Sequence, residues 1–407
     1  MEDAKNADLV SGGGEERGIK FGLVSVGNMG APLGGILTSF GHRVASPLSE
    51  RSEASRRRAL DFGIEDCHDL ESLIRGDGEG DWQGGADIFL SILPPSQAVD
   101  ICERVAKLSE EKEEQEEEGA LQGESKRRSR ERIFVDLNAI SPQTSERIKQ
   151  RIESVKAKGG EGVWKYVDGS IIGLPPRWDD EKAKGGAEGS ERGGSGSPPT
   201  FCPTIYLSSP DQDVLERLGA ILSKAHWKVR VIRAPGEDDQ DGQHQHRRVS
   251  SSGPSGGGES KALKLCNSAF LKGLMGIGAS SVLAVALTEV LNSTYPGVLD
   301  FLSEQLPNVA PKSYRFGGEM LEIEDFFSSM LTSSAAANGD GRKEGRRVER
   351  GKEISQLWRS MARVFDNIAE MVEEEERQHQ DAEEGGRLTT RQVLESWSKA
   401  GREILEE

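Results

Sequence analysis

Residues 21–34 read Phe-Gly-Leu-Val-Ser-Val-Gly-Asn-Met-Gly-Ala-Pro-Leu-Gly. A short apolar run breaks at Gly27 and Gly30 and continues into helix-compatible sequence, which is the pattern of a strand, a tight turn and the first helix of a dinucleotide-binding fold. Such a turn needs small residues because its backbone bends sharply and its N–H groups approach a pyrophosphate at the helix N-terminus. Ser25 stands where the first glycine of G-x-G-x-x-G is usually found, so this stretch alone is equally compatible with a turn that binds no ligand.

Strand-like and helix-like segments alternate through the first half of the chain, as expected for a parallel sheet covered by helices. We expect strands at residues 20–26, 42–46, 86–93, 132–137, 167–172, 204–208 and 229–232, and helices at 29–40, 52–62 and 96–108. From residue 260 onward the sequence predicts helices without a clear strand. The predicted fold class is therefore α/β, with an N-terminal Rossmann doubly wound sheet followed by a C-terminal all-α domain.

Segments of biased composition separate these regions. Hydrophobic residues make up 35% and charged residues 30% of the 407 residues, and the most polar segments cannot bury enough apolar surface to fold alone. We expect a disordered N-terminus at 1–18, an NAD(P)-binding domain at 19–235, a flexible insertion at 236–257 and an all-α substrate and dimerisation domain at 258–407. Solvated insertions are expected at 109–132, 179–199, 334–352 and 372–386.

Charge and cysteine content exclude several classes of function. A net charge of −17 argues against a nucleic-acid partner, and the basic patch at 126–132 is interpreted as the solvated half of a charge-segregated loop. The four cysteines have neither C-x-x-C spacing nor a disulfide framework, so no metal site is expected. Without a signal sequence or an apolar run of membrane-spanning length, the expected location is the cytoplasm, with no membrane partner.

The end of the second predicted strand indicates which nucleotide is preferred. Enzymes that select NAD usually place a carboxylate there, whereas those that select NADP place Arg and Ser near the additional phosphate. Arg51 and Ser52 favour NADP, while Glu50 keeps NAD possible. The alternative is a surface arginine at the start of a helix.

Four motifs occur in the order expected of the β-hydroxyacid dehydrogenase family, which the chain resembles. They are Gly27-Asn-Met-Gly30, Asp87-Ile-Phe-Leu-Ser-Ile-Leu-Pro-Pro95, Phe134-Val-Asp-Leu-Asn-Ala-Ile-Ser-Pro142 and Tyr166-Val-Asp-Gly-Ser-Ile-Ile-Gly173. Two later stretches, Ala262-Leu-Lys-Leu-Cys-Asn-Ser-Ala-Phe-Leu-Lys-Gly273 and Tyr314-Arg-Phe-Gly-Gly-Glu-Met-Leu-Glu322, are more similar to its 6-phosphogluconate-dehydrogenase-like branch. The resemblance covers most of 19–235 and 258–330.

The resemblance implies a lysine acid/base at the start of the helix that joins the domains, and Lys264 matches that position. Helical spacing places Asn267, Ser268 and Lys272 on the same face as Lys264. Partial burial beside a cofactor would lower the pKa of this lysine toward the working range, whereas the alternative is a lysine that extends from the surface into solvent. The cofactor-binding residues expected from the turn, the strand ends and the resemblance are Ser25, Gly27, Asn28, Met29, Gly30, Arg51, Ser52, Leu93, Pro94 and Asn138.

The substrate contacts expected here are Ser170, Asn267, Ser268, Lys272 and Arg315. The segment around Ser170 departs from the family's substrate loop, and Asn138 replaces a common serine, so no known substrate is transferred to this chain. Asn138 either binds the nicotinamide or substrate or caps the turn before Pro142. Arg315 either clamps a substrate carboxylate or phosphate, or forms a helix ion pair with Glu319 and Glu322.

These observations predict an NADP-preferring oxidoreductase that transfers a hydride between nicotinamide and a small hydroxy acid, with decarboxylation possible if the substrate carries a β-carboxylate. A small-molecule substrate and a homodimer are expected. Two alternatives stay open: an imine or carbonyl reductase on the same scaffold, and a non-catalytic dinucleotide-binding protein whose charged insertions recruit partners.

Overall fold

The computed structural model describes most of the predicted sheet and part of the helical region. The described residues are 18–76, 82, 85–121, 131–156, 162–178, 198–232, 258–281, 312–336 and 355–370, with single residues at 294, 297, 298, 300, 301, 305, 309 and 373. The predicted disordered N-terminus at 1–17, the insertion at 236–257, and almost all of the segments at 179–199, 334–352 and 372–386 lie outside them.

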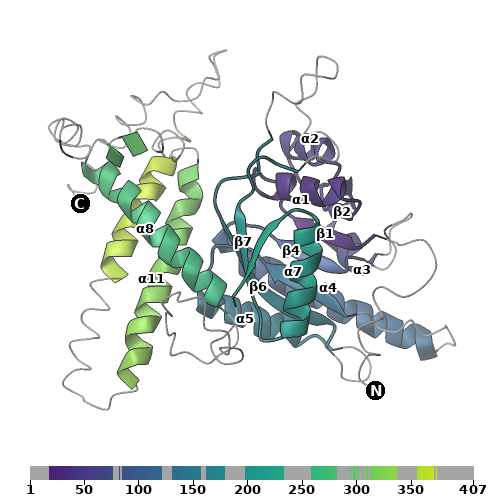
Figure 1. Ribbon diagram of the computed structural model, residues 1–407. Coiled ribbons are helices and arrows are strands. Elements are labelled where there is room, and N and C mark those ends of the chain that lie inside the picture. The colour runs from purple at the N-terminus through teal and green to yellow at the C-terminus, as the bar shows by residue number, and fades with distance from the viewer. Residues whose placement is uncertain are drawn as a thin grey trace, which may run out of the picture.

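Eight strands form one sheet in the order β3-β2-β1-β4-β5-β6-β7-β8 (Figure 1). Their bounds are β1 Lys20–Val24, β2 Arg43–Ser46, β3 Glu65–Asp66, β4 Ile88–Ser91, β5 Arg132–Asp136, β6 Trp164–Ile172, β7 Thr204–Ser208 and β8 Lys228–Val231. All neighbours are parallel except β6 and β7. The strand order reverses between β1 and β4, and in open α/β sheets ligands bind in the crevice beyond the carboxyl ends of such strands.

Strand side chains alternate between two cores because successive residues point to opposite faces of a sheet. Phe21 and Leu23 of β1, with Ile88 and Leu90 of β4, pack against α1 (Gly30–Ser39), α2 (Glu53–Asp61) and α7 (Gln212–Lys224). Phe89 and Phe134 face α3 (Leu70–Arg75), α4 (Pro95–Leu121) and α5 (Pro142–Glu153) on the other side. The predicted fold class, a Rossmann-type sheet followed by helices, is confirmed.

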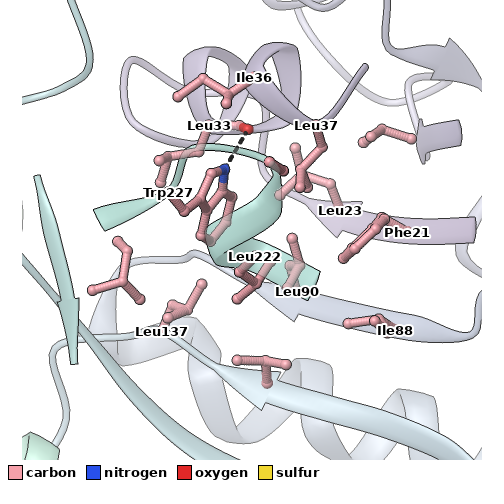
Figure 2. Close-up of a cluster of buried hydrophobic side chains, with 14 of the residues drawn as sticks. Phe21, Leu23, Leu33, Ile36, Leu37, Ile88, Leu90, Leu137, Leu222 and Trp227 are labelled. Atoms are coloured by element: carbon pink, nitrogen blue, oxygen red, sulfur yellow. Dashed lines mark hydrogen bonds between the residues drawn. The ribbon is translucent and has the colours of Figure 1, made fainter. Parts of the chain in front are cut away.

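The first core extends to the strand that closes the sheet. Trp227, which follows α7, is 2% exposed, and its indole Nε1 donates a hydrogen bond of 3.2 Å to the carbonyl of Leu33 in α1 (Figure 2). A buried indole N–H needs such a partner because an unsatisfied donor costs about 1–3 kcal/mol. The contact links α1, which begins at the glycine turn, to the far end of the sheet.

The first half of the segment predicted as a charged insertion, 109–132, belongs to a helix. Helix α4 continues to Leu121 without a break. Glu, Lys and Gln are good helix formers, and Ser109 is buried where its hydroxyl accepts a hydrogen bond from Trp164 Nε1. Glu103 and Glu110 of α4 form ion pairs with Arg151 of α5. The rest of that segment, 122–130, lies outside the described residues.

Helices also make up the described part of the chain after residue 258. α8 (Glu259–Ser281), α11 (Ser313–Ala336) and a helix at 355–370 share a small apolar core that includes Leu265, Phe316 and Phe365. These helices stand beside the sheet (Figure 1), and the start of α8 is close to β6. The start of α8 therefore lies at the carboxyl end of β5, two strands from β1 in the sheet.

Candidate functional site

The turn after β1 keeps the backbone form of a glycine turn without its first glycine. Ser25 has a φ of +86°, a region that side chains other than glycine rarely adopt. At Gly30 an added Cβ would lie 2.0 Å from the carbonyl oxygen of Ser25, so only glycine fits there. At Gly27 the nearest atom would be Ser25 Oγ at 3.6 Å, an ordinary contact. The protein therefore leaves open the space on the Gly27 side of the turn.

Ser25→Gly should raise the free energy of unfolding by up to about 1 kcal/mol, because relief of the positive φ outweighs the greater flexibility of glycine in the unfolded chain. Denaturant titration measures the change, and Ser25→Ala, which keeps the strain, is the matched control. A loss of stability in Ser25→Gly alone would show that the serine hydroxyl stabilises the turn more than its backbone strains it.

Helix α1 begins at this turn with no side chain satisfying its first N–H groups. Its N-cap, Met29, makes no side-chain cap hydrogen bond, and the first turn contains no acidic residue. Asn28 is exposed, and Met29 is half-buried. The Ala31 N–H donates to the Gly27 carbonyl at 3.1 Å, and Pro32 has no N–H. The partial positive charge of this helix N-terminus suits an anionic group.

Basic side chains gather where β2 ends. Arg51 is half-buried, and Ser52 caps α2 by accepting a hydrogen bond from the Ser55 N–H. Arg56 donates to the carbonyls of Leu48 and Ser49 at 3.0 and 2.6 Å. The corner therefore presents cations beside an open glycine turn, in a chain whose net charge is −17.

Arg58 connects this basic corner to the glycine turn, since its guanidinium donates to the carbonyl of Val26 at 3.3 Å. Arg56 and Arg58 were not among the residues predicted for this corner. The run Arg56-Arg57-Arg58, one turn into a helix that follows β2, was the available signal.

Asn138 has a structural role in this geometry. Its side-chain oxygen accepts the backbone N–H of Leu93, and its Nδ2 donates to Ser91 Oγ at 2.9 Å. These bonds tie the carboxyl ends of β4 and β5 together and leave the side chain 2% exposed. Leu93 and Pro94 are half-buried at the end of β4. Of the two roles predicted for Asn138, a ligand contact and a turn cap, the structure favours the role in a turn.

Lys264 lies in the second turn of α8, where the charges of Asp136 at the end of β5 and Asp168 within β6 act on it. The side chain is half-buried, and loss of hydration, together with the positive charges of Lys261 and Arg315, lowers the pKa of its amine to about 7. Asp136 and Asp168 act in the opposite direction. An amine with this pKa exchanges protons readily at neutral pH, which an ordinary surface lysine does not.

The other predicted substrate residues on α8 and β6 are buried or half-buried. Ser268, on the same helix face, is 7% exposed, and Asn267 is half-buried. Ser170 is fully buried in β6, with its hydroxyl 3.3 Å from that of Ser260 at the start of α8. Ser170 therefore joins the strand to the helix.

Arg315 is exposed and forms no ion pair with Glu319 or Glu322 within the described residues, so the predicted helix ion pair is wrong. Glu319 pairs instead with Lys272, whose ammonium also lies 4.6 Å from the centre of the Phe316 ring. Lys272 therefore lies buried between α8 and α11.

Glu322 binds the start of α5. Its carboxylate accepts the Ser141 N–H, while Asp325 accepts the Ser141 hydroxyl at 2.6 Å. Two carboxylates of α11 thus cap a helix of the sheet domain, and Arg315 stays available for another anion.

Among the described residues, no helix combines the length and hydropathy needed to cross a membrane. Nor does the described part of the chain bring together three or more His, Cys, Asp or Glu side chains in a way that could hold a metal ion.

Comparison with known proteins gives one family match and several similar structures. Residues 281–340 match the family model described as "Domain of unknown function (DUF1932)". No curated protein matches the chain. A conserved protein of unknown function, described as structurally similar to 3-hydroxyacid dehydrogenases, is 16% identical, with 85% of this chain and 99% of that chain covered and a TM-score of 0.44.

Two further solved structures are similar over most of their length. A 3-hydroxyisobutyrate dehydrogenase from Salmonella typhimurium is 12% identical, with 93% of this chain and 99% of that chain covered and a TM-score of 0.48. An imine reductase from Myxococcus stipitatus in complex with NADP+ is 14% identical, with coverages of 93% and 99% and a TM-score of 0.41. They include a member of the dehydrogenase family whose motifs the sequence resembles.

Proposed function

We propose that this chain is an NADP-preferring oxidoreductase that transfers a hydride between nicotinamide and the carbinol carbon of a small hydroxy acid, with Lys264 as the acid/base. The observation that carries the proposal is the half-buried amine of Lys264, with a pKa of about 7, near the carboxyl edge of a sheet whose first strand ends in an open glycine turn.

The residues at the turn fit a dinucleotide. The uncapped N-terminus of α1 and the space beside Gly27 suit a pyrophosphate, and Arg51 and Ser52, which follow β2, would recognise an adenosine 2′-phosphate. Arg58 holds the turn through the Val26 carbonyl. When bound, the dinucleotide supplies the hydride acceptor or donor.

Lys264 accepts or donates the proton of the substrate hydroxyl. In the oxidation direction its uncharged amine accepts the hydroxyl proton while the carbon–oxygen bond becomes a carbonyl and the hydride leaves the carbon. In the reverse direction the ammonium returns that proton. Positioned acid/base groups of this kind contribute about 10²- to 10⁴-fold to a rate.

Arg315 gives the proposed site its preference for an acid. The guanidinium is exposed, has no carboxylate partner among the described residues, and is close enough to affect the titration of Lys264. A carboxylate or phosphate of the substrate would receive two parallel hydrogen bonds from it. We therefore propose an anionic hydroxy acid as substrate.

A fluorescence titration with NADPH and NADH tests the nucleotide assignment. We expect saturable binding of both, with NADPH clearly tighter, and Arg51→Ala should weaken NADPH binding about tenfold or more while leaving NADH nearly unchanged, because a charge-assisted hydrogen bond contributes about 1.5–3 kcal/mol.

Arg217→Ala is the matched control for Arg51→Ala. Arg217 pairs with Glu131, next to the amino end of β5 and far from the turn in sequence. The absence of binding by either nucleotide at millimolar concentration would overturn the proposed function in favour of a non-catalytic protein.

A further inference from the structure

A row of buried polar side chains crosses the sheet directly beneath α8. Ser91, Asp136, Asp168 and Ser208 occupy paired positions on the successive strands β4, β5, β6 and β7. Each is at most 1% exposed. Paired residues of neighbouring strands point to the same face, so two carboxylates lie side by side in the interior. Buried charges are costly unless they are paired and hydrogen-bonded.

Lys261 supplies the compensating charge. Its side chain is fully buried, which is rare for lysine. Its ammonium lies within hydrogen-bond distance of Asp136 Oδ1, at 3.0 Å, and of the backbone carbonyls of Asp136, Asn138 and Gly169, at 2.9, 3.0 and 2.7 Å. Since an ammonium has three N–H groups, at least one of them is shared between two of these acceptors. Asp168 Oδ1 is 3.5 Å away. Acceptors from two strands and a loop thus fix the position of this nitrogen.

The residue before it strengthens the same attachment. The Ser260 hydroxyl donates to Asp168 Oδ2 at 2.8 Å, and the Ser208 hydroxyl donates to the same oxygen at 3.0 Å. Two successive residues of α8 therefore bind the polar row. Lys264 follows Lys261 by three residues, so both lie on one face of the helix, one turn apart. The position of Lys261 consequently determines the position of Lys264.

Charged groups on two helices and two strands act on Lys264, and the charge of Lys264 in turn lowers the pKa of Lys272, two helical turns farther along α8. Lys261 of α8 and Arg315 of α11 disfavour its protonation, whereas Asp136 of β5 and Asp168 of β6 favour it. Loss of hydration is the largest influence, and Lys261 is the largest of the charges. The carboxylates of the polar row therefore raise the pKa of Lys264, whereas Lys261 lowers it.

We propose that Lys261 is a positioning residue for Lys264: its buried ammonium fixes the first turn of α8 on β5 and β6 and holds a positive charge one helical turn from the Lys264 amine. This inference rests on the proposed function, because it describes how the proton acceptor of that reaction is prepared. It assigns no contact between Lys261 and substrate.

The test uses two variants with opposite expected signs. Lys261→Met removes the cation and leaves both carboxylates, so the titration midpoint of Lys264 should rise by about one pH unit or more. Asp136→Asn removes one carboxylate and keeps an acceptor for the Asn138 N–H and for Lys261, so the midpoint should fall. The rate of acylation of Lys264 by acetic anhydride, followed against pH by peptide mass spectrometry, measures the midpoint without nucleotide or substrate. Lys228, exposed on β8, is the internal reference.

A third variant keeps the test decisive if Lys261→Met does not fold. The double variant Lys261→Met/Asp136→Asn removes the buried pair together, which proteins tolerate better than loss of one partner. Its midpoint should lie above that of Asp136→Asn and close to that of the original protein. Equal midpoints in Asp136→Asn and the double variant would overturn the inference.

The outcome also separates this inference from the proposed function. If the midpoints shift as expected but no hydroxy acid is oxidised with either nucleotide, the coupling between the two lysines stands and the proposed function fails. If turnover occurs, its pH profile should shift in the same direction as the acylation midpoint in each variant. If Lys261 acts in folding alone, the acylation midpoint of Lys264 and the pH profile of turnover should both stay unchanged.

Discussion

Lys264→Met should reduce turnover at neutral pH by about 10²- to 10⁴-fold, the usual contribution of a positioned acid/base group. NADPH affinity should change little, because Lys264 is on α8 and the proposed nucleotide contacts are on the glycine turn and β2. The folded-state pKa of Lys264 lies below its value in the unfolded chain, so folding releases a proton and stability falls as pH decreases from about 10 toward 7. Methionine removes that dependence and should not lower stability at neutral pH.

Steady-state kinetics and a nucleotide titration on the same preparation measure the effect. The original protein should oxidise substrate faster as pH rises through about 7, because the uncharged amine is the proton acceptor, and should reduce it more slowly over the same range. Lys264→Arg should be as inactive as methionine, since guanidinium stays protonated. Lys224→Met, in the last turn of α7, is the control for loss of a lysine. Undiminished turnover in Lys264→Met would remove this lysine from the mechanism.

Gly27→Ala and Gly30→Ala should separate nucleotide binding from the stability of the turn. At Gly27 the new methyl group meets only Ser25 Oγ at 3.6 Å, so the protein should keep its melting temperature and lose about tenfold or more in NADPH affinity, as the methyl fills the approach of the pyrophosphate. At Gly30 the methyl would lie 2.0 Å from a backbone oxygen, so the turn itself must move. That variant should lose both affinity and about 1–3 kcal/mol of stability.

Thermal melting and fluorescence titration of both variants give the comparison. Gly219→Ala in α7, where the nearest atom to a Cβ would be Val231 Cγ2 at 3.5 Å, is a control for adding a methyl to a buried glycine away from the turn. Unchanged NADPH affinity in Gly27→Ala would mean that no pyrophosphate lies against this residue.

The elements that sequence reasoning predicted are those with a strong local pattern. The strands at β1, β4 and β5 are apolar runs with clear turn residues, and their positions agree with the structure to within a few residues. By contrast, β3 is two exposed acidic residues, Glu65 and Asp66, whose pairing with β2 depends on tertiary contact and leaves no apolar signal. The antiparallel pairing of β7 is likewise invisible in its own sequence, which resembles that of any buried strand.

The candidate site was predicted in part for the same reason. Lys264 stands out by its helical spacing, whereas Lys261 looks like an ordinary surface lysine at the start of a helix. Its burial depends on Asp136 and Asp168, which are far away in sequence and meet only through strand register. For Asn138 the sequence predicts either a ligand contact or a turn cap, because its two partners, the Leu93 N–H and the Ser91 hydroxyl, belong to another strand end.

The separation in sequence between Lys261 and its acceptors affects the order in which the protein can be made. Asp136 is 125 residues and Gly169 is 92 residues upstream of Lys261. During synthesis from the N-terminus, all eight strands precede α8, so the paired carboxylates must wait for a cation that the growing chain does not yet contain. We therefore expect the last packing step of the sheet to follow the synthesis of α8.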